Sequence, residues 1–258
     1  MSYESEKKHF DEQGFVIFKN LVSVDRLEKY KTYYKENNHL WKRTEEEQKN
    51  SGWEYRDDMH FDDEIINSFL TSNELLDVVR VLLDGHQPNL HLSLLPWVST
   101  GQDWHYDSVV ADFFGLYEEK HYHNPHKSHV GAWIALDKIE INSGPYGYIP
   151  FSNNFDYSNN SYFLSFKNEY EEKLLKEKKV SRGDDLSKFF SSQNIARHYA
   201  EMMRDFIKKS IMDGIFKDEV FLAEAGDVLF WSGKTIHCAH KSSPGFLRKN
   251  IIGHYHYS

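Results

Sequence analysis

Two side chains that commonly bind metal ions, His105 and Asp107, are separated by a single residue. On an extended strand alternate residues point to the same face, so this imidazole and this carboxylate can reach one ion together. A third candidate, His237, follows the apolar segment 226–231 near the end of the chain. The three residues form a two-histidine, one-carboxylate set, which is the ligand set of non-haem iron(II) oxygenases. An H-x-D pair alone is weak evidence in a chain with 15 His and 40 Asp and Glu, so the surrounding elements must support this interpretation.

The composition limits the classes of protein that the chain can be. Its 258 residues fit one large domain or two small ones, and the 16% aromatic content favours strands and ring-lined pockets. The net charge of −9 argues against partners such as nucleic acid or an anionic membrane, which require basic patches. Cys238 is the single cysteine, so no disulfide can form within the chain. With no apolar signal core and no run of transmembrane length, we expect a cytoplasmic protein.

The first third of the chain predicts helices around one strand. Segment 14–21 is rich in β-branched and aromatic residues and predicts a strand. A helix is predicted from Ser23, and segment 75–83 predicts a short helix that a glycine at position 85 ends. Segment 41–72 is polar and irregular in pattern, and its acidic run 45–47 indicates a solvated face or loop. The buried stripe of the first of these helices is predicted to be Leu27, Tyr30 and Tyr34.

The remainder of the chain predicts short strands interrupted by one helical segment. Segment 130–137 is continuously apolar, which indicates a strand buried on both faces, and 142–145 is a strong turn signal. The pattern favours a β-barrel or sandwich with helices before it. We expect one domain over residues 1–258, with a helical insertion that borders the mouth of the barrel. Its parts are an N-terminal strand and helices at 1–88, barrel strands at 89–154 and 216–258, and the insertion at 155–215.

Four segments, in this order, carry a resemblance to a known family. Residues 104–107 are similar to a W-H-x-D motif, and 132–136 with 143–145 to an A-W-x-A-L…N-G-P block. Residues 149–152 resemble the family's x-P-G-S-H motif. Residues 226–231 lead to His237, and Arg248 follows eleven residues after that histidine, as in the family's closing motif. Over nearly its whole length the chain resembles the phytanoyl-CoA dioxygenase family of Fe(II)- and 2-oxoglutarate-dependent oxygenases.

The resemblance implies a fold, cofactors and a reaction. The fold is mainly β with flanking helices, a double-stranded β-helix of the jelly-roll, cupin-like type. Iron(II) is expected on His105, Asp107 and His237, with 2-oxoglutarate and O2 as co-substrates. Arg248 suits the far carboxylate of 2-oxoglutarate, because a guanidinium binds a carboxylate through two parallel hydrogen bonds, and Trp133 is expected to flank the co-substrate. The reaction implied is hydroxylation, or another oxidation, of a C–H bond in a small molecule, with release of succinate and CO2.

Two departures from the family pattern and one agreement with it bear on this expectation. Cys238 and Ala239 follow the distal histidine where members often have Gly-Ser, which puts one hydrogen bond to the co-substrate in doubt. Phe151 and Asn153 replace the glycine and the histidine of P-G-S-H. Asp107 itself conforms: related halogenases have a small residue there, so we expect oxidation and not halogenation.

Other histidines offer rival or additional ligands. His240 competes with His237, which we prefer because it follows the apolar strand directly and has the family's spacing from Arg248. If Arg248 faces the cavity, alternation along 248–256 turns His254 inward as well. A cluster with no spacing typical of a structural metal site is interpreted as a solvated or substrate-facing loop, and consists of His121, His123, His126 and His129.

Two other classes of function stay open. One is a cupin-like metalloenzyme that needs no 2-oxoglutarate, and the other is a non-catalytic binding protein with a vestigial site. We expect substrate contacts from residues 112–129 and from the insertion. The sequence leaves open whether the substrate is a CoA thioester or a free small molecule, and whether the protein is a monomer or a homodimer.

Overall fold

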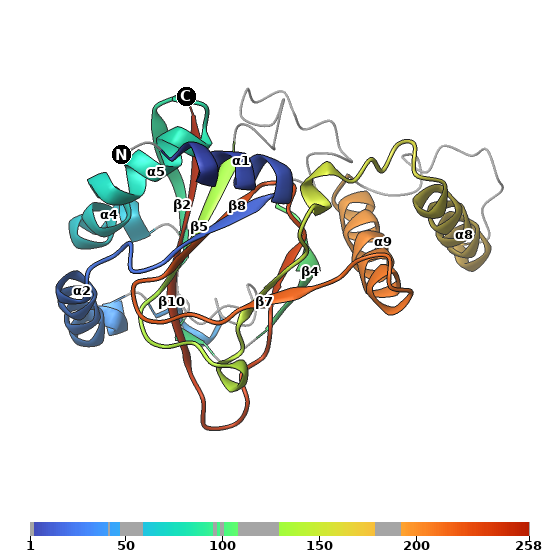
Figure 1. The fold of residues 1–258 in the computed structure, drawn as a ribbon. Helices are drawn as coiled ribbons and strands as arrows, with labels where there is room; N and C mark the ends of the chain where they lie inside the picture. Colours follow the sequence, from blue (N-terminus) through green and yellow to red (C-terminus); the bar gives the residue numbers. More distant parts are fainter. Residues whose placement is uncertain are drawn as a thin grey trace.

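The protein contains two antiparallel sheets that face each other, as the computed structural model shows (Figure 1). It describes residues 3–40, 42–46, 59–94, 97–98, 101–107, 129–178 and 192–257. The larger sheet has the order β1-β8-β5-β10-β2, with β3 paired to β10, and the smaller has the order β4-β9-β6-β7. The larger sheet consists of β1 (Phe15–Phe18), β8 (Val228–Ser232), β5 (His129–Ala135), β10 (Arg248–Tyr257), β2 (Pro88–Leu94) and β3 (Trp97–Val98). The smaller consists of β4 (Gln102–His105), β9 (His237–Ala239), β6 (Tyr146–Tyr148) and β7 (Glu219–Phe221). The predicted jelly-roll class is confirmed.

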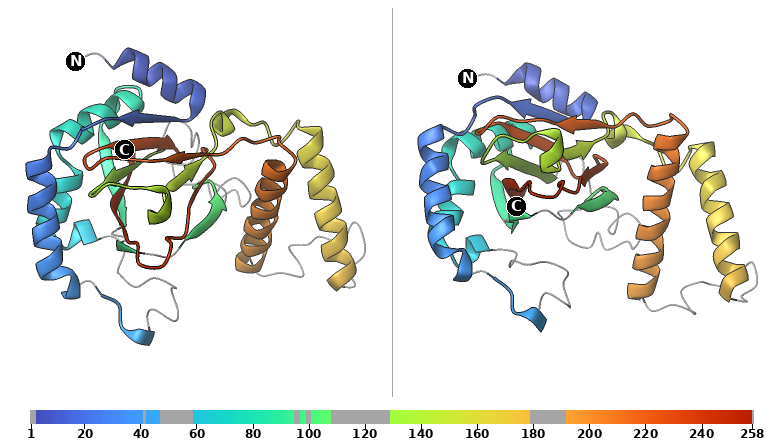
Figure 2. Two further views of the ribbon diagram at one scale, coloured as in Figure 1. Left: turned by 60° about the horizontal axis from the view of Figure 1, so that its bottom comes forward. Right: turned by 90° about the horizontal axis from the view of Figure 1, so that it is seen from below.

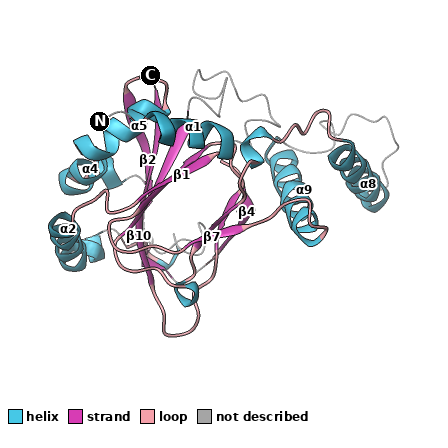
Figure 3. Ribbon diagram, viewed as in Figure 1, coloured by secondary structure: helices cyan, strands magenta, loops and turns pink. Residues whose placement is uncertain are grey.

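Helices flank the sheets on two sides (Figures 1 and 3). N-terminal helices lie beside the larger sheet, and of two longer helices one lies beside β4 and the other packs against it from outside. The first group is α1 (Glu4–Gln13), α2 (Val24–Asn37), α4 (Glu64–Leu70) and α5 (Asn73–Leu82), and the second is α8 (Ser161–Lys178) and α9 (Ser192–Met212). Short 3-10 turns complete the fold at Asn38–Leu40, Met59–Phe61, Ile141–Ser143 and Ser152–Asn154. No helix within the described ranges is long and apolar enough to cross a membrane.

Strand β5 lies between two hydrophobic cores. Every residue of this strand is buried, as its continuous apolar pattern predicts. Val130, Ala132 and Ile134 pack with the N-terminal helices, whereas Trp133 and Ala135 pack in the space between the sheets. A strand with apolar neighbours on both faces has no polar alternation, which explains its uninterrupted hydrophobic sequence.

The N-terminal helices confirm one prediction and correct another. Helix α2 buries Leu27, Tyr30 and Tyr34, the predicted stripe. Segment 64–70, which we expected to be irregular, is helix α4. The Asp63 carboxylate accepts hydrogen bonds from the first backbone N–H groups of this helix, and three side chains at helical spacing are buried. Helix α4 has only seven residues, which is too few for a helical period to stand out in the sequence. The three buried residues are Ile66, Phe69 and Leu70.

The segment that we predicted as a helical insertion forms α8 and α9, which lie side by side (Figure 2). Phe206 on α9 is fully buried and contacts aromatic rings from α8, from the loop before α8 and from the segment after α9. Helix α9 also packs against β4, where Lys208 and Arg204 pair with Asp103 at 2.9 and 3.6 Å. The insertion therefore borders the strand that carries the first candidate ligand. The division of the chain into domains stays a prediction.

Candidate functional site

The pairing of β4 with β9 brings the three candidate metal ligands together. His105 lies directly opposite His237 in this pairing, and the two imidazole centroids are 4.3 Å apart. Asp107 follows β4, with its Oδ1 atom 3.4 Å from His237 Nε2 and 3.9 Å from His105 Nε2. One potential ligand atom from each residue lies within 4.8 Å of the other two. A single metal ion can contact all three.

Backbone carbonyls orient both histidines. His105 Nδ1 lies 2.7 Å from the carbonyl oxygen of Asp103, and His237 Nδ1 lies 2.9 Å from that of Thr235. A carbonyl oxygen only accepts, so each Nδ1 carries a hydrogen, and the tautomer with its lone pair on Nε2 is the one that these bonds select. Both lone pairs therefore belong to the nitrogens nearest Asp107 Oδ1. Such outer hydrogen bonds are typical of metal-binding histidines.

Asp107 is held by a neighbouring indole and is anionic at neutral pH. Trp231 donates its Nε1–H to Asp107 Oδ2 at 2.8 Å, so the two carboxylate oxygens have different partners. Trp231 fits because Gly131 lies opposite it on β5, where a Cβ atom would stand 2.2 Å from the indole ring. Burial alone raises the pKa of Asp107, but the nearby imidazoles, His237 foremost, outweigh it and hold this pKa well below its usual range. Burial, and then His237, lowers the pKa of His105 to about 4, so its ring is neutral at pH 7.

Arg248 lies at the start of β10, on the face that looks between the sheets. Its side chain is 3% exposed, and it donates to the carbonyl oxygens of Gly144 at 2.5 Å and His240 at 2.8 Å. Its Nε atom lies 3.3 Å from Asn250 Oδ1. Burial lowers the pKa of the guanidinium to about 10, which still leaves it charged at neutral pH. A buried cation in this position suits a ligand carboxylate.

Two buried polar atoms near Arg248 and the metal-binding group have no hydrogen-bond partner among the described residues. They are the hydroxyl of Tyr146 and the amide nitrogen of Asn250. The Tyr146 ring stacks on His237 with centroids 5.2 Å apart, and Trp133 is its neighbour at 6.3 Å. Unsatisfied buried donors require an explanation, and the oxygens of a bound dicarboxylate supply one. The residues present therefore fit both a metal ion and 2-oxoglutarate. Sequence reasoning missed Tyr146, although this residue directly follows the Gly-Pro turn.

The histidines outside the candidate triad lie in different parts of the structure. The His240 ring lies against Trp104 and Cys238, outside the metal-binding group. His254 faces inward, with Nδ1 3.9 Å from Asp107 Oδ2. His129 corrects an expectation: it belongs to β5, is 7% exposed and lies 4.0 Å from Asp107, so it is neither solvated nor in a loop. The cluster was judged by its spacing alone, which cannot show that the last member begins a buried strand. Its other members, at 121, 123 and 126, lie outside the described residues.

Phe151 stands in a backbone conformation that favours glycine. Its φ is +63° and its side chain is 59% exposed. This is the position at which the family motif has glycine, so the chain has kept the turn without the residue that suits it.

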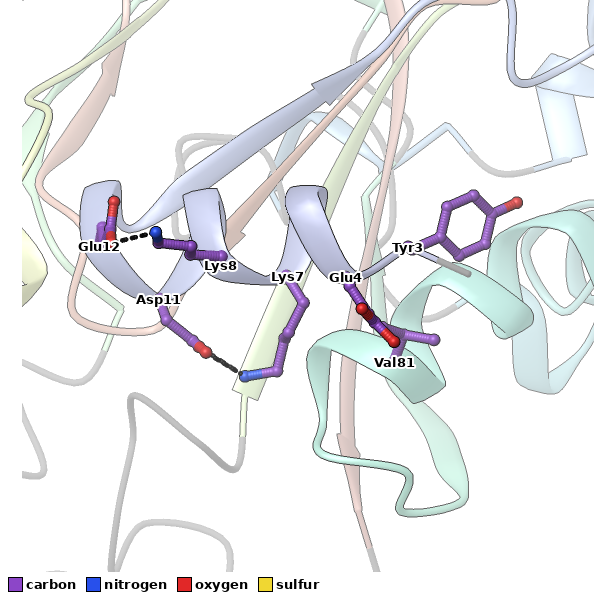
Figure 4. Close-up of a pocket in the computed structure, with 7 residues that line it drawn as sticks. All are labelled: Tyr3, Glu4, Lys7, Lys8, Asp11, Glu12 and Val81. Carbon is purple, nitrogen blue, oxygen red and sulfur yellow. Dashed lines mark hydrogen bonds and ion pairs between the residues drawn. The ribbon is translucent and has the colours of Figure 1, made fainter. Parts of the chain in front are cut away.

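A surface pocket lies on helix α1 (Figure 4). It contains none of the candidate site residues. Its charged groups pair with one another, as Lys7 does with Asp11 and Lys8 with Glu12. We assign it no chemistry.

The two facing sheets and the two-histidine, one-carboxylate group define a jelly-roll protein with a candidate metal-binding centre. More particularly, the chain belongs to the phytanoyl-CoA dioxygenase (PhyH) family, whose sequence model matches residues 10–250. The protein is therefore a 2-oxoglutarate-dependent dioxygenase that uses iron(II), 2-oxoglutarate and O2. No curated protein matches the chain in sequence.

Solved structures share this fold at low sequence identity. The carbocyclase SnoK from nogalamycin biosynthesis is 15% identical, with a TM-score of 0.62 over 100% of this chain and 84% of its own. The epimerase SnoN, in complex with Fe3+, alpha ketoglutarate and nogalamycin RO, is 13% identical, with a TM-score of 0.62 over 98% and 83%. EctD from S. alaskensis, with 2-oxoglutarate and 5-hydroxyectoine, is 14% identical, with a TM-score of 0.62 over 100% and 76%. At such identities the likeness concerns the fold.

Proposed function

We propose that His105, Asp107 and His237 hold iron(II), and that Arg248 binds the far carboxylate of 2-oxoglutarate. The enzyme then hydroxylates, or otherwise oxidises, an unactivated C–H bond of a small-molecule substrate and releases succinate and CO2. The observation that carries this proposal is the convergence of two lone pairs, each fixed by a backbone carbonyl, on one anionic carboxylate oxygen. The likeness to an epimerase and a carbocyclase is the reason for including C–H oxidations other than hydroxylation.

The side chains of this protein position the reactants and exclude water. Bound iron and 2-oxoglutarate, with O2, supply the oxidising power for the C–H bond. Trp231 occupies Asp107 Oδ2 and so leaves Oδ1 for the metal. Tyr146 and Asn250 donate hydrogen bonds to the co-substrate, in place of the Gly-Ser that the chain lacks after its distal histidine. Trp133, on the interior face of β5, flanks the co-substrate and limits access of water.

An anaerobic titration tests this proposal. Metal-free protein that receives iron(II) and 2-oxoglutarate is expected to develop the weak visible charge-transfer band of a chelated keto acid. Asp107→Ala and His237→Ala should abolish the band, and His240→Ala should retain it. Bound iron without the band would favour a cupin-like enzyme that needs no 2-oxoglutarate. No binding of iron at all would indicate a vestigial site.

We also keep the cytoplasm as the proposed location. The single cysteine, Cys238, is buried, and burial raises its pKa to about 12, so it is an unreactive thiol that needs no oxidising compartment.

A further inference from the structure

Four imidazoles form one continuous surface beside the candidate metal centre. They come from three adjacent strands, β2, β10 and β5, of the larger sheet (Figure 1). Their ring centroids are 4.6 Å apart for His91 and His256, 5.6 Å for His91 and His129, and 5.1 Å for His129 and His254. We call this surface the histidine wall, and its members are His91, His129, His254 and His256.

Two histidines of the wall lie beside Asp107, the carboxylate that we assign to iron. His129 Nδ1 and His254 Nδ1 lie 4.0 and 3.9 Å from Asp107 Oδ2, on the side of Asp107 away from its Oδ1 contacts with His105 and His237. Arg248 lies on the same face of β10, six residues before His254. Because that arginine marks the co-substrate end of the space between the sheets, the wall lies toward the opposite end of β10. A molecule held there has its atoms next to the metal.

The bond between two rings of the wall requires that at least one of them is neutral. His129 Nε2 and His254 Nδ1 are 2.9 Å apart, so one of these nitrogens must be a lone pair that accepts from the other. Two protonated rings cannot make this bond. His91 is a neutral ring as well, because burial lowers its pKa to about 3. A neutral imidazole offers one donor and one acceptor.

His91 has hydrogen-bonding capacity that no described residue uses. Its Nδ1 atom is buried and has no partner within the described part of the chain. The bulge between β2 and β10 leaves His91 without a Cα partner in the pairing, and this irregularity turns the residue toward His256. An unpaired nitrogen in a buried wall indicates a ligand that completes it.

We propose that the histidine wall binds the substrate through uncharged hydroxyl groups. This inference rests on the proposed function and names the class of substrate. A hydroxyl both donates and accepts, so it matches rings that each offer one donor and one acceptor. A carboxylate only accepts and would stand near Asp107 and the bound dicarboxylate. An ammonium group only donates and leaves the imidazole N–H groups unmatched.

A second metal ion is the alternative that the geometry raises, since Asp107, His129 and His254 also lie within reach of one ion. Two existing hydrogen bonds oppose it. Trp231 already donates to Asp107 Oδ2, and His254 Nδ1 is already bonded to His129. A metal bound to His254 Nδ1 would have to displace the bond to His129, and it would share Asp107 Oδ2 with the Trp231 N–H.

The test uses matched small probes and a readout that does not depend on turnover. Protein labelled with 15N in its histidine rings is loaded with zinc(II), a diamagnetic substitute for iron, and with 2-oxoglutarate. Cyclohexane-1,2-diol, cyclohexanecarboxylate and cyclohexylamine are titrated separately, and the ring nitrogen shifts give a Kd for each probe. We expect the diol to bind most tightly and to shift the ring nitrogen resonances of the four histidines of the wall.

Substitutions separate the wall from the rest of the protein. His91→Phe and His256→Phe keep an aromatic ring, and each should weaken diol binding about threefold to tenfold. The exposed His39→Phe should leave it unchanged. The proposal would be overturned if the carboxylate or the amine bound more tightly than the diol. It would also be overturned if the two variants bound the diol as tightly as wild type, or if no probe shifted the resonances. Two zinc ions per chain in wild type and one in His254→Phe would assign the wall to a metal instead.

The proposed function is judged separately in the same preparations. His91→Phe should still develop the charge-transfer band with iron(II) and 2-oxoglutarate. Absence of the band in wild type would refute the proposed function, whereas diol shifts of the wall resonances can still be measured in metal-free protein.

Discussion

At the scale of single residues, two buried tryptophans provide a matched pair with separate roles. Trp231→Phe removes the N–H that holds Asp107, and loss of such an outer hydrogen bond typically weakens metal affinity about 10- to 100-fold. Trp133→Phe makes the same replacement at an indole that is buried to the same extent and that we assign to the co-substrate pocket. We expect the first substitution to raise the Kd for iron(II), and the second to raise the Kd for 2-oxoglutarate with iron affinity retained. Equal iron affinities in the two variants would contradict the role assigned to Trp231.

Phe151 predicts a stabilising substitution. Its positive φ costs a residue with a Cβ atom about 1–2 kcal/mol, whereas glycine adopts this conformation freely but loses about 0.5–1 kcal/mol of chain entropy on folding. Phe151→Gly should therefore raise the free energy of unfolding by about 0.5–1 kcal/mol in urea denaturation. Phe246→Gly, at a partly exposed position with ordinary φ, is the control and should lower it. A destabilised Phe151→Gly variant would show that the exposed ring contributes packing.

Some site residues could be predicted from local spacing, whereas His237, Arg248 and Trp133 were predicted from the family motifs. His105 and Asp107 are two residues apart on one strand, so their common face could be inferred directly. The bond from Trp231 to Asp107 and the burial of His129 depend on which strands become neighbours. Position 107 follows β4 of the smaller sheet and position 231 lies in β8 of the larger, so they meet only because the two sheets face each other, and no local pattern records this.

At the scale of elements, Phe206 is expected to hold the two long helices together. It contacts rings from α8, from the loop before it and from the segment after α9. Phe206→Ala should cost about 3–5 kcal/mol locally, since it removes a fully buried aromatic ring. Limited proteolysis should then cleave within 161–212 faster, while the sheets stay protected. Met212→Ala, at an 86% exposed position of the same helix, should not change cleavage.

Helices and strands could be predicted from the sequence where the hydrophobic pattern extends over a whole element. Strand β5 and helix α2 each present a continuous or periodic apolar signal over a whole element. Strand β9, which has only three residues, was not predicted as a strand, although it carries His237. It exists because β4 and β6 pair with it on either side, which is a property of the sheet and not of residues 237–239.

At the scale of the whole molecule, the buried histidines predict a dependence of stability on pH. Burial lowers the pKa of both His91 and His254 to about 3, from an ordinary value of 6.5 in the unfolded chain. Between these values the unfolded chain binds more protons, so the free energy of unfolding falls as the pH falls from 6.5 toward 3. Above pH 7 neither group contributes to the slope.

Urea denaturation of metal-free protein at pH 7, 6 and 5 measures this slope. Replacement of His91 by Gln should reduce it near pH 5 by about 1 kcal/mol per pH unit. Unchanged slopes in the variant would show that His91 titrates normally in the folded protein.

Removal of metal should lower stability without unfolding the chain. Backbone pairing of β4 with β9 and the hydrophobic clusters position the triad through contacts that do not involve an ion. Iron(II) at 100 times its Kd should add about 2.7 kcal/mol and raise the Tm by about 5–10 °C. A chelator should return the Tm to the lower value with the far-UV circular dichroism intact. Loss of the far-UV signal at 25 °C would mean that the metal is required for folding.

The contact between Gly131 and Trp231 has a consequence for how sequences of this kind can change. A glycine within a strand is unfavourable by itself, but a methyl group here would occupy the space of the indole. A larger residue at 131 is therefore admissible only with a smaller ring at 231, and a smaller ring gives up the N–H at Asp107. The two positions should covary among related chains, with glycine at the first wherever tryptophan stands at the second. Natural drift at position 131, which touches neither metal nor substrate, would thus be limited by the iron chemistry two contacts away.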